Sequence, residues 1–142
     1  MSSWAEGVLA LVVLLGFGLA LVLFSGESIG GGATATTQPV AIDPEAAARG
    51  GALAQSTGCL QCHTVDGTPG SGPTFRGLAG SSRPLASGET VIADDIYLFN
   101  SIVDPSAQIG AGFEAIMPPD YGDALTEAEV EDLVEYIESL GE

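Results

Sequence analysis

The segment GCLQCH at residues 58–63 contains both cysteines and the only histidine of the 142-residue chain. On a helical turn Cys59, Cys62 and His63 occupy positions i, i+3 and i+4, so their side chains project from one face. Two thiols and one imidazole placed in this way can hold a single group between them. The spacing therefore constrains the fold strongly, because the rest of the chain must enclose whatever these side chains bind.

C-x-x-C-H is the attachment pattern of c-type haem. Two thiols can bond the vinyl groups along one haem edge, while His63 reaches the iron from the proximal side. A structural zinc site needs four Cys or His ligands, and a thioredoxin-like C-x-x-C needs a βαβ context that this chain lacks. A plain disulfide between Cys59 and Cys62 stays open, but it leaves His63 without a role. We therefore expect one haem c, bound covalently through Cys59 and Cys62.

The second axial ligand of the iron can be sought by elimination. The chain has no lysine, and its methionines are Met1 and Met117. Met117 lies in IMPPDYG, where Pro118 and Pro119 stiffen the chain. We expect iron ligation by His63 and Met117. The alternatives are that Met117 is an ordinary core residue, or that the iron has an open site suited to gas binding or peroxidase-type chemistry.

The N-terminal part of the chain is predicted to be a membrane anchor. Residues 7–24 carry no polar side chain, and as a helix these 18 residues span about 27 Å, close to the ~30 Å hydrocarbon core of a bilayer. A cleaved signal peptide would have a basic start, and a core helix would have a polar face, but neither is present. We expect an anchor helix at 1–24, a flexible Gly- and Thr-rich linker at 25–42 and one folded domain at 43–142.

The domain is predicted to be all-α, since no strand-like alternation appears in its sequence. A first helix begins at Asp43 and Pro44 and contains Gly50–Gly51, which indicates a close crossing by another helix. Residues 64–92 are rich in Gly, Pro, Ser and Thr and are expected to form a long ordered loop. A second helix is expected at 93–103.

The last helix has the clearest sequence signature. Thr126 and Glu129 form a capping box, and apolar residues recur at helical spacing from Val130 to Leu140. Outside the helices the domain has few large apolar side chains, so a domain of this size needs an apolar group to complete its core. A porphyrin would supply that group.

The charge of the domain argues against nucleic acid and anionic lipid as partners. From residue 43 onward the chain carries 17 Asp and Glu against three Arg. Such a surface repels nucleic acid and anionic lipid, and it attracts basic protein surfaces.

Together these residues resemble a class I c-type cytochrome. The resemblance covers residues 43–142 and is carried by CLQCH, GPTFRGLAG, the methionine loop and the C-terminal LVEYIESL. The stretch VIADDIYLFNSIVDPSAQIGAGFEAIMPP is similar to the monohaem cytochrome c of alternative complex III and to the cytochrome c domain of caa3-type oxidases. The chain departs from the oxidase subunit because it lacks the cupredoxin domain and the second membrane helix.

The resemblance implies roles for further residues. The carbonyl of Pro73 would accept a hydrogen bond from the proximal histidine, and Tyr136 would pack over Gly50–Gly51. Arg76 and Arg83, in the loop around the haem, are candidate partners of the haem propionates, although either can be a solvated charge. Tyr97 and Tyr121 would line the haem crevice or donate to a propionate, or simply pack.

The resemblance also implies a function. We expect a one-electron carrier that is not an enzyme by itself, in the bacterial cytoplasmic membrane with its haem domain on the periplasmic side. Its partners would be other subunits of a respiratory or photosynthetic complex and a basic electron carrier. The alternatives are a haem sensor or peroxidase-like protein with a displaceable Met117, and a structural subunit whose haem only supports folding.

Overall fold

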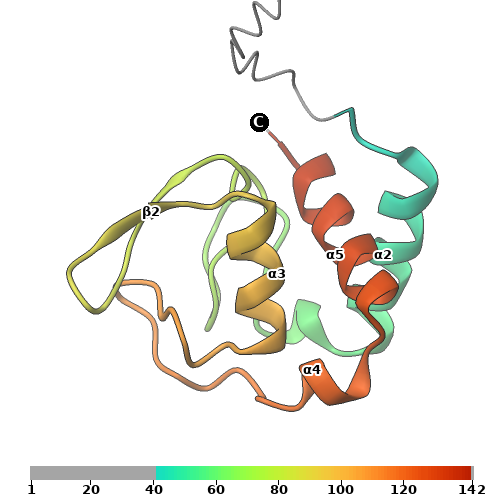
Figure 1. The fold of residues 1–142 in the computed structure, drawn as a ribbon. Helices are drawn as coiled ribbons and strands as arrows, with labels where there is room; N and C mark the ends of the chain where they lie inside the picture. Colours follow the sequence, from blue (N-terminus) through green and yellow to red (C-terminus); the bar gives the residue numbers. More distant parts are fainter. Residues whose placement is uncertain (1–40, 142) are drawn as a thin grey trace, which may run out of the picture. The chain divides into compact units, whose positions relative to one another are not determined.

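The computed structural model describes residues 41–141 (Figure 1). In chain order these form α2 (Pro44–Ser56), the 3-10 turn η1 (Cys59–Gln61), β1 (Ser82–Pro84), β2 (Thr90–Ile92), α3 (Asp95–Val103), α4 (Tyr121–Ala124) and α5 (Glu127–Ser139). The predicted anchor at 1–24 and almost all of the predicted linker lie outside the described residues. Between residues 41 and 141 no helix is long and apolar enough to cross a membrane.

The domain is mostly helical, but the expectation that it contains no strand is wrong. β1 pairs antiparallel with β2, with Arg83 opposite Val91. The turn between them closes where the Leu85 amide donates to the Glu89 carbonyl at 2.8 Å, and Gly88 in this turn has a φ of 93°. Strands of three residues are too short to show an alternating pattern, so the loop composition of residues 64–92 concealed them.

The apolar core lies between α2, α3 and α5. The predicted apolar stripe of α5 is confirmed, since Val130, Leu133, Val134 and Ile137 are all buried. Figure 1 shows α2 and α5 side by side, with α3 beyond α5. The other buried members of the core are Ala54, Phe75, Leu78, Ala93, Leu98 and Ile102.

The predicted close crossing at Gly50–Gly51 is confirmed. A Cβ atom placed on Gly50 would lie 1.8 Å from the Asp132 carbonyl oxygen, so the two helix backbones touch there. A Cβ on Gly51 would lie 3.1 Å from the ring of Tyr136, which therefore packs over this glycine as the resemblance implied. Only glycine leaves room for this contact between α2 and α5.

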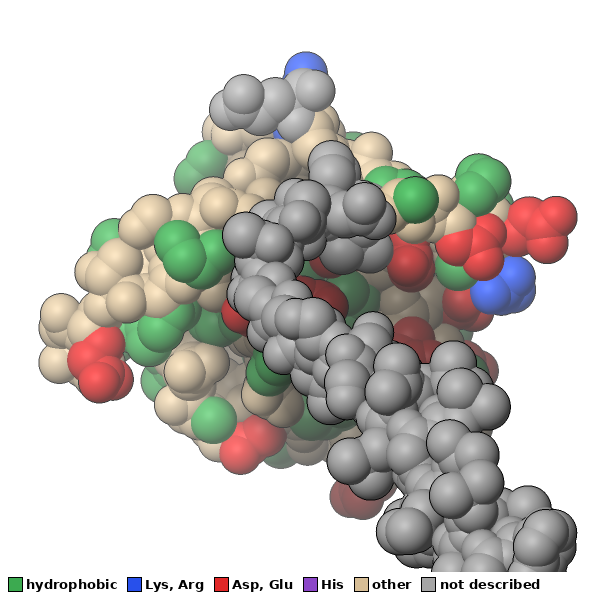
Figure 2. Space-filling view, turned by 45° about the horizontal axis from the view of Figure 1, so that its top comes forward, with side chains coloured by type: hydrophobic (Ala, Val, Ile, Leu, Met, Phe, Trp, Pro, Cys, Tyr) green, Lys and Arg blue, Asp and Glu red, His purple; other side chains and the backbone are tan. Residues whose placement is uncertain are grey.

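Most charged side chains of the domain are acidic, with 17 Asp and Glu against three Arg from residue 43 onward. Figure 2 shows the acidic side chains at several separate places on one face, where basic side chains are few. Arg49, on α2, forms an ion pair with Asp132 on α5 at 2.6 Å. Its guanidinium is therefore partly neutralised, and it lowers the pKa of the Asp132 carboxyl through a hydrogen bond.

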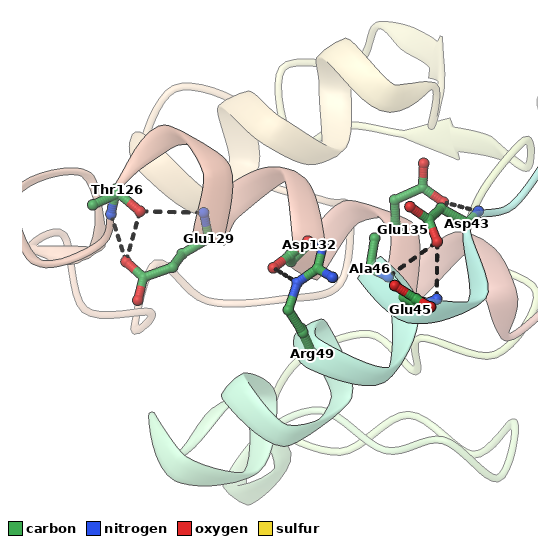
Figure 3. Close-up of polar contacts among 8 residues, drawn as sticks. All are labelled: Asp43, Glu45, Ala46, Arg49, Thr126, Glu129, Asp132 and Glu135. Atoms are coloured by element: carbon green, nitrogen blue, oxygen red, sulfur yellow. Dashed lines mark hydrogen bonds and ion pairs between the residues drawn. The ribbon is translucent and has the colours of Figure 1, made fainter.

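Polar contacts stabilise the first turn of α2, the first turn of α5 and the crossing between these two helices (Figure 3). The Asp43 side chain accepts from the amide of Glu45 at 2.9 Å, as expected for the cap of α2. The predicted capping box of α5 is confirmed, because Thr126 accepts from the Glu129 amide and the Glu129 carboxylate accepts from the Thr126 amide.

Replacing Gly50 by Ala is expected to destabilise the holoprotein by roughly 2 kcal/mol or more relative to Gly51→Ala. Both changes improve helix propensity by about 1 kcal/mol, so the difference isolates the steric conflict. The Cβ at residue 50 would meet rigid backbone, whereas the Cβ at residue 51 would meet a tyrosine ring that can shift slightly. Denaturant unfolding of both variants, followed by haem absorption, measures the difference. Equal stabilities would show that the helices are not tightly packed at this point.

Candidate haem site

The attachment motif lies directly after α2. Gly58 has a φ of 83°, which turns the chain into η1. The amides of Cys62 and His63 both donate to the Cys59 carbonyl, at 3.2 and 3.0 Å. This turn brings Cys59, Cys62 and His63 to the wall of one cavity, as their spacing predicts.

The cavity has a volume of about 550 Å³ and a mainly apolar wall. This size is typical of sites that enclose a small organic molecule, roughly 300–1,000 Å³. The sequence-predicted site residues that line it are Cys59, Cys62, His63, Pro73, Arg83, Tyr97, Met117 and Tyr121. Arg76 is exposed and does not line the cavity.

One hydrogen bond fixes the chemical form of His63. Its Nδ1 lies 2.8 Å from the Pro73 carbonyl oxygen. Because a carbonyl only accepts, Nδ1 must carry the proton, and Nε2 is left with a free lone pair. Burial lowers the pKa of His63, although the bond to Pro73 opposes this effect, so the neutral ring is favoured. A neutral imidazole with a free Nε2 is the form that binds a metal.

The two thiols are free to react with a cofactor. Cys59 is partly buried, Cys62 is exposed, and they do not form a disulfide. Within residues 41–141 no group of three or more Cys, His, Asp or Glu side chains is placed to hold a bare metal ion.

A family model described as cytochrome c matches residues 47–141, two thirds of the chain. The chain belongs to the cytochrome c family. Members of this family bind haem c covalently and transfer electrons through it, and Cys59 and Cys62 supply the pair of attachment thiols here. No curated protein matches the chain.

Two polar atoms in the cytochrome c cavity fit the needs of a haem. Within residues 41–141, Arg83 Nε and Ser101 Oγ are buried without a hydrogen-bond partner, and both residues line the cavity. A buried unpaired donor is costly, by about 1–3 kcal/mol, so a bound polar group is expected to satisfy it. The carboxylates of haem provide such a group. Arg83 is therefore the stronger propionate candidate, and Arg76 is the weaker one.

The two cavity tyrosines have different surroundings. Burial raises the pKa of the Tyr121 hydroxyl, which stays protonated and donates to the Thr57 carbonyl at 3.3 Å. This bond ties α4 to the end of α2, so the hydroxyl of Tyr121 is already engaged. Tyr97 is partly buried on α3, and it lines the cavity.

Three residues near the site were missed by sequence reasoning. Ser101 lies one helical turn after Tyr97 on α3, so its position on the cavity side could have been inferred from that spacing. Gly72 and Phe75 flank the predicted Pro73 and both line the cavity. Phe75 stacks on the imidazole of His63 with ring centres 4.6 Å apart, which no local pattern indicates.

Replacing Arg83 by Gln is expected to lower the midpoint potential of the haem, whereas Arg76→Gln leaves it nearly unchanged. A half-buried positive charge beside the haem would disfavour the oxidised iron, so its removal would favour that state. The exposed charge of Arg76 is screened by solvent and salt. Potentiometric titration of both variants provides the comparison. Equal effects of the two substitutions would contradict the assignment of Arg83.

Proposed function

We propose that this domain is a one-electron carrier whose haem iron is held by His63 on one side and Met117 on the other. The observation that carries this proposal is the His63–Pro73 hydrogen bond, which leaves Nε2 as a ligand at the wall of the same cavity that Met117 lines. Met117 is partly buried, and no other methionine is found in residues 41–141. The proline pair after it restrains its backbone.

The proposed ligand pair determines the chemistry. Bound haem supplies Fe(II)/Fe(III) exchange, and a Met/His pair raises its reduction potential. Two protein ligands leave no coordination position for a substrate, so the protein by itself is a carrier rather than an enzyme. The mainly apolar wall gives a bound haem a largely apolar environment, and the neutral His63 needs no proton transfer during the exchange.

Part of the cavity wall is exposed at the surface, including one of the attachment thiols. Cys62 lines the cavity and is exposed, and the cavity-lining Ile116 is 56% exposed. A haem edge at this exposed part of the wall would be accessible to a redox partner. We place electron entry and exit there.

The wider assignment rests on the sequence resemblance. The chain would be a subunit anchored through residues 1–24 in the bacterial cytoplasmic membrane, with the haem domain on the outer side. Its parent would be a quinol-oxidising complex of the alternative complex III type or a terminal oxidase. The acidic surface supports docking of a basic carrier or of a basic neighbouring subunit.

Replacing Met117 by Ala is expected to open the sixth coordination position and lower the midpoint potential while the haem stays attached. The reduced variant should then bind carbon monoxide rapidly at neutral pH, whereas the wild type should not. Ile116→Ala is the matched control, because Ile116 borders the cavity but offers no ligand. Absorption spectra with and without carbon monoxide measure the effect. Rapid binding by the wild type would favour a sensor or peroxidase-like function.

Membranes solubilised in mild detergent should yield this cytochrome together with subunits of its parent complex. Mass spectrometry of the purified material identifies them, and electron-transfer rates at rising salt distinguish two modes of association. A steep fall of the rate with salt indicates a transient basic partner, because salt screens exposed charges beyond about 10 Å at 0.1 M. A rate insensitive to salt indicates a fixed subunit. Recovery of the protein without detergent and without partners would contradict the membrane assignment.

A further inference from the structure

The segment 70–75 holds the backbone on both sides of His63. The amide of Gly72 donates to the Cys62 carbonyl at 3.0 Å, and the amide of Phe75 donates to the Thr64 carbonyl at 2.8 Å. Between these two bonds Pro73 accepts from the imidazole. The same short segment therefore contacts His63 through its neighbours in the chain and through its ring.

Gly72 also packs against the imidazole ring itself. A Cβ placed on Gly72 would lie 2.6 Å from Cε1 of His63 and 2.9 Å from each ring nitrogen. This set of distances places the Cβ over the face of the ring, above Cε1, rather than at its edge. Any side chain at residue 72 would have to displace the imidazole.

Phe75 provides an aromatic contact with the same ring. It lies nearly parallel to the imidazole, at 15° and 4.6 Å between ring centres. Phe75 is only 6% exposed, and it meets the ring of Tyr136 edge-on at 6.4 Å and 86°. Tyr136 in turn packs over Gly51. A continuous series of contacts thus links the α2–α5 crossing to His63.

The hydrogen bond to Nδ1 does not by itself fix the rotation of the imidazole ring. The terminal torsion of histidine is broad, so packing on the ring faces must restrict its rotation. We infer that Gly72 and Phe75 are positioning residues that fix the orientation of the imidazole plane about its bond to the iron. The hydrogen bond to Pro73 determines which ring nitrogen is left free to bind the iron. Gly72 and Phe75 determine how the plane of the imidazole is oriented. This inference rests on the proposed ligation by His63.

The test compares full-length ferric holoprotein carrying Phe75→Leu, Phe75→Tyr or Val134→Ala. Electron paramagnetic resonance is the readout, because the g values of low-spin ferric haem depend on the orientation of the axial ligand planes. We expect Phe75→Leu to shift the g values and Phe75→Tyr, which keeps a stacked ring, to retain those of the wild type. Val134 is buried in α5 but does not line the cavity, so Val134→Ala should lower stability without moving the g values.

A second variant guards against failure of Phe75→Leu to assemble. Tyr136→Leu leaves the stacked pair in place but removes the edge contact that supports it, and it should shift the g values in the same direction by less. Unchanged g values in both variants would overturn the inference while leaving the proposed function intact. A wild-type spectrum without low-spin ferric haem would contradict the proposed ligation, and the inference with it.

Discussion

The contact between α2 and α5 at Gly50 determines where the haem site forms. The attachment motif begins three residues after α2 ends, so the angle and depth of α2 on α5 set the position of Cys59. A backbone contact of this kind cannot slide, because Asp132 meets Gly50 directly and the ring of Tyr136 covers the next residue. The ion pair between Arg49 and Asp132 spans the same crossing. The packing of α2 on α5 therefore sets the position of the attachment motif in the cavity wall.

The protein core and the cavity wall share the same side chains. Leu98, Ile102, Leu133 and Ile137 belong to the buried core and also line the cavity. Haem bound there would therefore extend this apolar core and would add to the apolar surface that is buried in the folded domain. Such an extension would compensate for the few large apolar residues that the domain has outside its helices.

Much of the fold and the attachment site could be predicted because the signals are local. The caps at Asp43 and Thr126, the apolar stripe of α5 and the C-x-x-C-H spacing each depend on residues within one or two turns. The glycine pair indicated a helix crossing because two glycines in a helix need compensation. The family match at residues 47–141 agrees with the fold expected from these signals.

Features that depend on tertiary contacts could not be predicted. The sequence offers no signal that distinguishes Arg76 from Arg83 as a propionate partner. Arg83 lies in β1, which pairs with β2, and it lines the cavity, whereas Arg76 does not. The stacking of Phe75 on His63 joins residues 12 positions apart through an irregular loop. The membrane anchor and the ligand role of Met117 stay predictions.

The placement of the three arginines has a consequence for how the molecules of this cytochrome meet one another. Arg49 is occupied by Asp132, and Arg83 lines the cavity, so among residues 41–141 Arg76 is the one exposed cation outside an ion pair. Two copies of the domain consequently approach each other as bodies of like sign and repel within about 10 Å at 0.1 M salt. This repulsion disfavours self-association of the domain, and it equally disfavours the close approach that electron exchange between identical copies would need.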